Sequence, residues 1–342
     1  MINSELGHDL LLENTKPKLS YAFKKDFNGW KGQVRNKFIE LTGLDEIEKN
    51  DCPLNFQIKS RETKNGYQLI AFTFDSEVGE TVPCYLCIPD NISGKRPVAI
   101  TLQGHSTGFH NSIGEIRYKQ DEDYQPRGSF ALQAVENGYI ALAIEQRGMG
   151  VRMTNKPNRL PNCMCQYASR VALGLGRTII GERVWDIHKA IDVLERYFPE
   201  CDSDKIIITG NSGGGTTSYY ATCYDDRIKI CAPSCSFCSY KESILNIAHC
   251  ACNYIPFMYK YFDMQDLACM IAPRNLIVIA GKEDDIFPIE GVRKGFKTIS
   301  EIYKDSLSES NCKLIETPKG HWWCEDIVWP AINEECKKLG WK

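Results

Sequence analysis

Short apolar runs recur along most of the chain and alternate with segments of helical spacing. After residue 96, each run is bounded by a loop and followed by a stretch in which apolar residues recur at steps of three and four. Continuous apolar runs of this length are typical of parallel strands buried on both faces. We predict strands at 97–102, 139–144, 205–210, 228–233, 275–280 and 312–317, and helices at 129–138, 181–198, 291–304 and 325–338. The pattern predicts an α/β fold, with a mainly parallel central sheet flanked by helices.

The first part of the chain has a different pattern. Within residues 21–44, the spacing of apolar residues predicts an amphipathic helix. The residues on its apolar face are Phe23, Phe27, Trp30, Val34, Phe38 and Leu41. Two alternating runs at 67–76 and 81–90 predict an antiparallel hairpin. We therefore expect an N-terminal helical extension at 1–50 and one main domain at 51–342.

Three connections of the main domain are too long to be simple links. They span residues 105–128, 146–180 and 234–272. Long ordered insertions in compact domains are often functional. We predict that these three cover the functional end of the sheet.

Composition and charge narrow the classes of ligand. The 342 residues are 43% hydrophobic and 25% charged, and the formal net charge is −3 with no long basic run. This charge pattern gives no indication of nucleic-acid or membrane-surface binding and favours a small-molecule ligand. The first residues lack the apolar core of a secretory signal, and no apolar run reaches about 18 residues, the length of a membrane span. We expect a cytoplasmic protein, and leave homo-oligomerisation open.

Two serines lie in a G-x-S-x-G pattern, Ser106 in "GHSTG" and Ser212 in "GNSGG". A nucleophile elbow needs a strand, a tight turn with small residues, and then a helix. Ser212 meets these conditions because the apolar run 205–210 precedes it and "GGTTSYYATCY" continues as a helix. The residues after Ser106 have no helical periodicity until about 129. We predict that Ser212 is the nucleophile.

The stretch that contains Ser106 has another expected role. In hydrolases with this elbow, the loop after an earlier strand supplies one backbone N–H to the oxyanion hole, and the residue after the nucleophile supplies the other. We therefore predict that the amides of His105 and Gly213 form the oxyanion hole.

A serine nucleophile needs a histidine base and an acid to orient it, here in the order serine, acid, histidine. Asp284 and Asp285 both follow the predicted strand 275–280. His321 follows the next strand and is the one histidine of the six that comes after them. The expected catalytic residues are Ser212, His321 and one of these two aspartates.

With these residues the chain resembles the α/β-hydrolase superfamily. The branch that it resembles most is the acetyl-xylan-esterase-like group, which is related to prolyl-oligopeptidase catalytic domains. The resemblance spans about residues 95–335 and rests on "GNSGGG", "GRTIIGERVWDIHKAIDVL" and "CNYIPFMYKYFDMQDLACMIAPRNLIVIAGKEDDIFP". It implies that 51–342 is a catalytic domain and that Asp284 is the acid. In "EQRGMG", Glu145 stands where the family has Asp, and we expect Arg147 to brace the loops. Gly213 stands where acetyl-xylan esterases often have Gln, which points away from xylan itself.

Cysteines raise the question of a metal. Sixteen cysteines in a chain without an export signal indicate reduced, buried thiols. Cys84 and Cys87 lie on a predicted strand and should face opposite ways. Cys235 and Cys238 lie in a loop, where His249 or Cys250 could complete a zinc site, but this spacing matches no known finger. We expect neither a metal nor a cofactor.

Three classes of function fit these residues. The favoured one is a serine esterase that hydrolyses small acetyl-type esters of a carbohydrate or small metabolite through an acyl-enzyme. The alternatives are an amidase or aminopeptidase-like serine hydrolase and a hydrolase-fold protein without catalysis. We expect a small acyl pocket walled by Phe109, Tyr254, Phe257 and Trp322.

Overall fold

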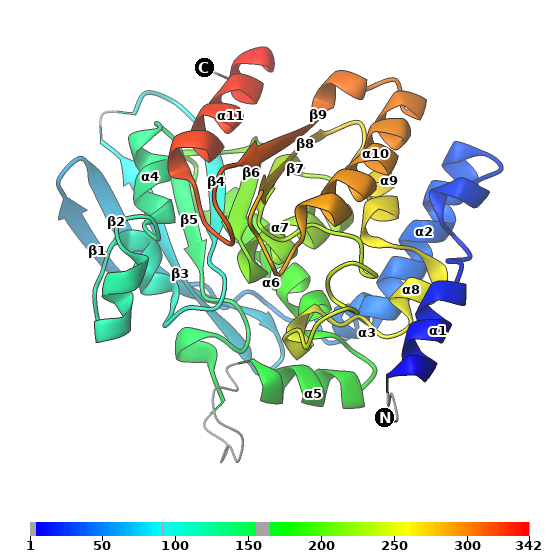
Figure 1. Ribbon diagram of the computed structural model, residues 1–342. Helices are drawn as coiled ribbons and strands as arrows, with labels where there is room; N and C mark the ends of the chain where they lie inside the picture. Colours follow the sequence, from blue (N-terminus) through cyan, green and yellow to red (C-terminus); the bar gives the residue numbers. More distant parts are fainter. Residues whose placement is uncertain (1–4, 91, 155–164, 342) are drawn as a thin grey trace.

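The computed structural model describes residues 5–90, 92–154 and 165–341, and its centre is a twisted sheet (Figure 1). Within these ranges the strands lie in the order β1-β2-β3-β5-β4-β6-β7-β8-β9. The strands are β1 (Gln57–Lys64), β2 (Tyr67–Glu77), β3 (Glu80–Pro89), β4 (Arg96–Leu102), β5 (Ile140–Ile144), β6 (Cys201–Asn211), β7 (Ile228–Ser234), β8 (Asn275–Gly281) and β9 (Cys312–Thr317). β1, β2, β3 and β5 pair antiparallel, and the strands from β5 onward pair parallel. The carboxyl ends of β4, β6, β8 and β9 therefore open on the same edge of the sheet.

Helices cover both faces of this sheet. The α-helices are α1 (Leu6–Asn14), α2 (Phe27–Thr42), α3 (Leu44–Glu48), α4 (Phe130–Glu136), α5 (Gln166–Gly174), α6 (Ile179–Tyr197), α7 (Gly213–Tyr224), α8 (Met258–Tyr261), α9 (Ala268–Ile271), α10 (Ile289–Asp305) and α11 (Glu325–Lys338). One apolar core joins the sheet to α2, α3, α6, α7, α9 and α10, and a second core joins the opposite face to α4 and α11. Both faces of the central strands are thus buried, as their continuous apolar runs require.

Short 3₁₀ helices occupy the long connections. They are η2 (Phe109–Ile113) and η3 (Lys119–Tyr124) after β4, η4 (Gly150–Arg152) after β5, and η5 (Ala251–Asn253) and η6 (Met264–Leu267) after β7. Two more, η1 (Tyr21–Phe23) and η7 (Glu309–Asn311), precede α2 and β9. The described parts of the connections after β4, β5 and β7 thus contain short helices, and they carry residues that line or border the site described below.

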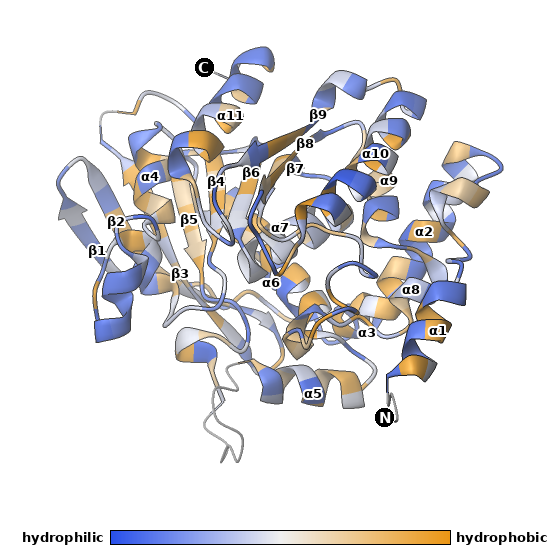
Figure 2. Ribbon diagram, in the orientation of Figure 1, coloured by the Kyte–Doolittle hydropathy of each residue, from blue (hydrophilic) through white to orange (hydrophobic). Residues whose placement is uncertain are grey.

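The predicted α/β fold with a mainly parallel sheet is confirmed. All six predicted strands and all four predicted helices of the main domain are present, with ends that differ by at most four residues. The hairpin is also present, as β2 and β3. β1 was not predicted, because "QIKSRETK" is polar and almost entirely exposed. Figure 2 shows β1 in blue and β5 in orange, so hydropathy marks the buried strand and not the exposed one.

The helix predicted within residues 21–44 begins later than its apolar spacing suggested. Trp30, Val34 and Phe38 are buried on α2 as predicted, but Phe23 is 56% exposed and precedes the helix. The reason is the N-cap: the Asp26 carboxylate accepts a hydrogen bond from the Gly29 amide and starts α2 at Phe27.

In the part of the chain that the structure describes, no helix is both long and apolar enough to span a bilayer.

Candidate active site

Ser212 lies between the end of β6 and the first turn of α7, in a strained backbone conformation. Its φ is 55° and its ψ is −125°, in a region that residues other than glycine rarely adopt. The turn is tight: a Cβ on Gly214 would lie 2.1 Å from the Leu102 carbonyl oxygen, so only glycine fits there. The Ser212 amide donates to the Ser234 carbonyl at 2.9 Å, which fixes the turn to β7. This is the geometry of a nucleophile elbow.

His321 and Asp284 form a hydrogen-bonded pair after β9 and β8. The Nδ1 atom of His321 lies 2.9 Å from Oδ2 of Asp284, which is buried. The other carboxylate oxygen accepts from the amides of Ile286 and Phe287, at 2.9 and 3.1 Å. These contacts fix the carboxylate, which in turn orients the imidazole. Asp285 is exposed, as expected of the neighbour that the resemblance did not select.

The two loops that carry this pair approach each other very closely. A Cβ on Gly281, at the end of β8, would lie 2.1 Å from the Gly320 carbonyl oxygen. Glycine at position 281 therefore allows the histidine loop to reach the aspartate. Because Nδ1 of His321 is taken by Asp284, Nε2 is the nitrogen left to act as a base.

Ser212 and His321 line the same cavity, which has a volume of about 340 Å³. Among the described residues, none forms a hydrogen bond with the Ser212 hydroxyl, so that hydroxyl is not held by another group. Catalytic hydrogen bonds often tighten only when substrate is present. The structure thus brings Ser212 and the His321–Asp284 pair to one cavity, as the sequence analysis expected.

The segment at Gly104 and His105 lies against the elbow. A Cβ on Gly104 would lie 2.9 Å from Cβ of Ser212 and 3.5 Å from the amide nitrogen of Gly213. Neither the His105 amide nor the Gly213 amide donates to another described residue. Two free N–H groups beside the serine are what an oxyanion hole requires.

Ser106, the second serine in a G-x-S-x-G pattern, is not in an elbow. Its hydroxyl is buried and lies 3.0 Å from the side-chain amide of Gln103. The chain after Ser106 enters η2 instead of an α-helix. Gln146 then ties Gln103 to α7: it donates to the Gln103 carbonyl at 2.5 Å and accepts from the Thr217 hydroxyl at 2.6 Å. Ser106 and Gln103 thus help to hold the loop after β4.

A buried carboxylate, Asp121, organises the rest of the loop after β4. It accepts from the amides of Arg117 and Tyr118 at 2.7 and 2.8 Å, lies 3.0 Å from Nε2 of His110, and also bonds the Thr107 hydroxyl. Burial opposes ionisation, but these hydrogen bonds outweigh it and lower the pKa of Asp121 well below its ordinary value. An ionised hub of this kind keeps the loop rigid.

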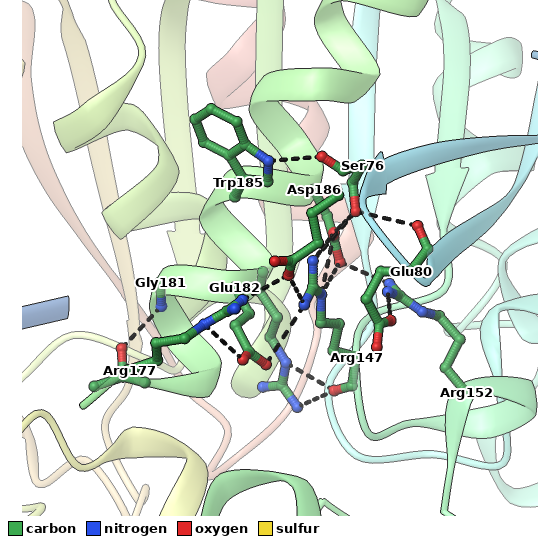
Figure 3. A network of polar contacts seen from close by, with 12 residues as sticks. Ser76, Glu80, Arg147, Arg152, Arg177, Gly181, Glu182, Trp185 and Asp186 are labelled. Atoms are coloured by element: carbon green, nitrogen blue, oxygen red, sulfur yellow. Dashed lines mark hydrogen bonds and ion pairs between the residues drawn. The ribbon is translucent and has the colours of Figure 1, made fainter. Parts of the chain in front are cut away.

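Arg147 lies in a buried ion-pair network (Figure 3). Its guanidinium contacts the carboxylates of Asp186, at 2.9 Å, and Glu77. Arg152 also reaches Asp186, at 2.6 Å. These contacts join the loop after β5 to α6 and β2, which agrees with the bracing role expected of Arg147.

Glu145, at the start of the same loop, has a separate set of partners. The residue is 2% exposed, and its carboxylate accepts from the amides of Phe109 and Val151, at 3.2 and 3.1 Å. Burial raises the pKa of Glu145 to about 7, although these two hydrogen bonds lower it. Glu145 therefore links the loops after β4 and β5.

The prediction of which residues wall the acyl pocket was wrong. Phe109, Tyr254, Phe257 and Trp322 do not line the cavity at Ser212. Phe109 is buried and stacks on Tyr85, Phe257 is 64% exposed, and the Arg127 guanidinium covers the Trp322 ring at 3.8 Å. Besides His105, Ser212 and His321, the side chains that line the cavity are Gln103, Ser106, Asn111, Tyr124, Arg127, Phe130, Asn211 and Ile286. Loop length alone gave no means of choosing which aromatic residues face the serine.

A second cavity, of about 530 Å³, adjoins the first and shares His105, Ser106 and Tyr124 with it. Its other lining residues are Thr107, His110, Arg117, Tyr118, Gln120, Gly150, Val151 and Met153. Most of these side chains are polar and can form hydrogen bonds.

Within the described residues, neither cysteine pair noted in the sequence gathers as a pair into a possible metal-binding group; Cys235 lies in one without Cys238, together with Asp284 and His321. Cys84 and Cys87 belong to the cores on opposite faces of the sheet, as their strand positions predicted. Cys235 contacts the carbonyls of Gly320 and Trp322, whereas Cys238 contacts that of Pro288. The zinc alternative built on this pair is therefore wrong.

A different set, missed by the sequence analysis, does gather. His105 meets three cysteines, Cys165, Cys250 and Cys252, which come from the insertions after β5 and β7. Its only local signal was the Cys-x-Cys spacing of Cys250 and Cys252, because the other two residues are far away in sequence.

Comparisons with known proteins assign the family. The profile of the Abhydrolase family matches residues 4–309, and the chain belongs to this hydrolase family. The protein named "Putative hydrolase YtaP" of Bacillus subtilis (strain 168) is 27% identical over 245 residues, which are 71% of this chain and 78% of that protein.

Solved structures share the fold. A protein of Bacteroides fragilis NCTC 9343, named a "putative acetyl xylan esterase", has a TM-score of 0.80 and 20% identity over 98% of this chain and 95% of its own. Acetyl xylan esterase 1 of Thermoanaerobacterium sp. JW/SL YS485 has a TM-score of 0.62 and 18% identity over 95% and 96%. A glucuronoyl esterase from Solibacter usitatus has a TM-score of 0.65 and 15% identity over 95% and 98%. These comparisons confirm the family resemblance and the α/β-hydrolase fold.

Proposed function

We propose that the protein is a serine esterase that removes small acetyl-type acyl groups from a carbohydrate or another small alcohol. The observation that carries this proposal is the strained Ser212 at the end of β6, in one cavity with His321, which is hydrogen-bonded to the buried Asp284. The names of the acetyl xylan esterases that share the fold add support for ester chemistry.

The reaction proceeds in two halves. The Ser212 oxygen attacks the ester carbonyl carbon while Nε2 of His321 takes the hydroxyl proton, and the amides of His105 and Gly213 stabilise the developing oxyanion. The tetrahedral intermediate then collapses: the bond to the alcohol oxygen breaks, and His321 gives its proton to that oxygen. Water next attacks the acyl-enzyme with His321 as base, which releases the carboxylic acid and restores the serine.

The two adjoining cavities favour a small acyl group and a polar alcohol. The cavity at Ser212, about 340 Å³, is near the lower end of the range for small-molecule sites, which is about 300 to 1,000 Å³. The larger cavity beside it offers the exposed side chains of Arg117, Tyr118 and Gln120 as hydrogen-bonding groups. We assign the acyl group to the first cavity and the hydroxyl-rich alcohol to the second.

A substrate panel with covalent labelling tests this proposal. We expect turnover of acetyl esters of p-nitrophenol and of acetylated sugars, much slower turnover of aminoacyl and peptidyl anilides, and a fluorophosphonate adduct on Ser212. Ser212→Ala should abolish both turnover and labelling. Faster turnover of the anilides would instead favour the amidase alternative, and a wild-type protein with neither turnover nor an adduct would favour a hydrolase-fold protein without catalysis.

A further inference from the structure

We propose that His105, Cys165, Cys250 and Cys252 form a structural zinc site that fixes the oxyanion loop. Three thiols and one imidazole are a standard ligand set for structural zinc. They come from three separate parts of the chain: the loop after β4, the residue before α5, and η5 with the residue before it. Cys165 and Cys252 are each 1% exposed, and His105 and Cys250 are partly buried.

The four ligand atoms lie about as close together as the ligand atoms of a coordination tetrahedron. Nε2 of His105 lies 3.1, 3.5 and 3.6 Å from the sulfurs of Cys165, Cys250 and Cys252, and the sulfurs of Cys165 and Cys250 are 3.2 Å apart. All four atoms lie within 4.8 Å of one another. With Zn–S of about 2.3 Å and Zn–N of about 2.0 Å, tetrahedral ligand atoms are separated by about 3.5 to 3.8 Å. A small movement of each side chain therefore suffices to bind the ion.

The surroundings suit an anionic metal site. Three thiolates around Zn²⁺ carry a net charge of −1, and the guanidinium of Arg183, 1% exposed, lies in electrostatic range of Cys165 and Cys252. Its Nε and Nη2 atoms donate to the Arg147 carbonyl, while Nη1 has no hydrogen-bond partner among the described residues. A buried guanidinium whose Nη1 amino group donates to no described oxygen or nitrogen is the expected balance for this charge.

Two side-chain amides also direct N–H groups at the sulfurs. Gln166 donates to Cys250 at 3.9 Å, and Asn253 donates to Cys252 at 3.8 Å. Donors around metal-bound groups orient them and stabilise their charge. All four positions are filled by protein ligands, which is the arrangement of structural and not of catalytic zinc.

The position of His105 links the proposed zinc site to the oxyanion hole. Its ring is the metal ligand, while its backbone amide is one of the two oxyanion donors in the proposed esterase mechanism. A Cβ on Gly213 would lie 3.8 Å from the His105 ring, so the ring packs beside the second donor residue. The ion would thus hold the loop after β4 to the insertions after β5 and β7. This coupling to activity rests on the proposed function; the metal site itself does not.

Metal content is the first test. We expect one zinc ion per chain when the full-length protein is purified without chelator from zinc-supplemented cells. Inductively coupled plasma mass spectrometry measures this content. Cys250→Ser and Cys252→Ser should lower this content severalfold, whereas Cys52→Ser and Cys312→Ser, outside the cluster, should keep it at one. Wild-type protein that neither retains nor takes up zinc, or zinc content that the cluster variants leave unchanged, would refute the site.

Spectroscopy of the wild-type protein tests the site without any variant, so the result does not depend on whether a variant folds. Zinc-edge X-ray absorption should fit three sulfurs and one nitrogen, and cobalt replacement should give the intense visible bands of tetrahedral thiolate coordination. Oxygen-dominated coordination would overturn the proposal. So would a Cys165–Cys250 disulfide found by mass spectrometry in protein purified under reducing conditions.

Ester turnover before and after zinc removal tests the coupling. Since complete loss of an oxyanion donor costs about 10² to 10³ in kcat, a loosened loop should lower kcat by up to about 10²-fold, with recovery on zinc addition. Unchanged kcat after zinc removal would refute the coupling but leave the site intact. If the protein binds zinc and hydrolyses no ester, the proposed function fails and the site stands.

Discussion

Oδ2 of Asp284 lies 2.9 Å from Nδ1 of His321, while Oδ1 of the same carboxylate accepts two backbone amides. Every hydrogen bond that this buried group receives thus fixes its orientation toward the imidazole. Asp285, the next residue, is exposed and makes no such contact with the histidine. This difference separates two aspartates that the local sequence alone left equivalent.

Asp284→Asn should lower kcat by about 10⁴-fold. The amide favours the wrong imidazole tautomer and removes the charge that stabilises the imidazolium, and the same change in a serine protease triad has an effect of this size. Asp285→Asn is the matched control and should change kcat little. Steady-state kinetics on p-nitrophenyl acetate measures both, and equal losses at the two positions would contradict the assignment.

Ser106→Ala should leave covalent chemistry intact and lower kcat only partially. The lost hydrogen bond to Gln103 loosens the loop that carries the His105 amide, but Ser212 and His321 keep their places. The loss should stay below the 10² to 10³ that removal of an oxyanion donor costs, about 10-fold at most. Fluorophosphonate labelling followed by peptide mass spectrometry should still find the adduct on Ser212; an adduct on Ser106 in the wild type would overturn this reading.

Ile286→Ala should widen the range of acyl chains that the enzyme accepts. Ile286 lines the cavity at Ser212, and its backbone amide, which holds Asp284, is kept in the variant. One methylene in a pocket is worth about 1 to 3 kcal/mol, so kcat/KM for hexanoyl relative to acetyl esters should rise about 10-fold. Leu307→Ala, at a residue that is 96% exposed, should leave this ratio unchanged. A wild type that already prefers octanoyl esters would refute the small acyl pocket.

Glu145→Gln should change the pH dependence of stability. Burial raises the pKa of Glu145 from 4.5 to about 7, so between these values the folded protein holds a proton that the unfolded chain releases. The free energy of unfolding therefore falls as pH rises through this window, by about 3 kcal/mol once pH exceeds 7 (about 2.5 pKa units at about 1.4 kcal/mol each).

The variant lacks this titration while its amide oxygen keeps an acceptor for Phe109 and Val151. Urea unfolding of both proteins at pH 5 and pH 8 isolates the effect, because the other titrating groups cancel in the difference. The stability of Glu145→Gln relative to wild type should increase by about 2.5 kcal/mol from pH 5 to pH 8, because part of the loss in wild type has already occurred at pH 5. The same difference at both pH values would show that Glu145 does not titrate in this range.

The local sequence was sufficient to predict a site residue where a strand, a turn and a helix follow one another along the chain. The apolar run before Ser212 and the helical segment after it distinguished this serine from Ser106, and the order of strands placed His321 after the aspartates. Strand order also brings the ends of β6, β8 and β9 to one edge, so these groups meet in space.

Contacts between distant segments could not be predicted in the same way. The cluster of His105 with Cys165, Cys250 and Cys252 depends on how two insertions fold back on the loop after β4, and no periodicity describes that. The prediction of the pocket walls was wrong for the same reason: Tyr254 and Phe257 lie in a long insertion but do not line the cavity at Ser212. The exposed β1 was missed because its pairing with β2, and not its own hydropathy, makes it a strand.

β1 is also the last strand on its side of the sheet, and one of its edges offers unpaired backbone groups. Such an edge is a template for adding a strand from another molecule. Here the strand carries a row of charged side chains, Lys59, Arg61, Glu62 and Lys64, on an almost wholly solvated ribbon. Lysine-rich, polar edges resist this kind of growth, since a second strand would have to desolvate the charges. The polar, charged sequence that kept β1 from being predicted as a strand thus protects the folded protein against edge-to-edge aggregation.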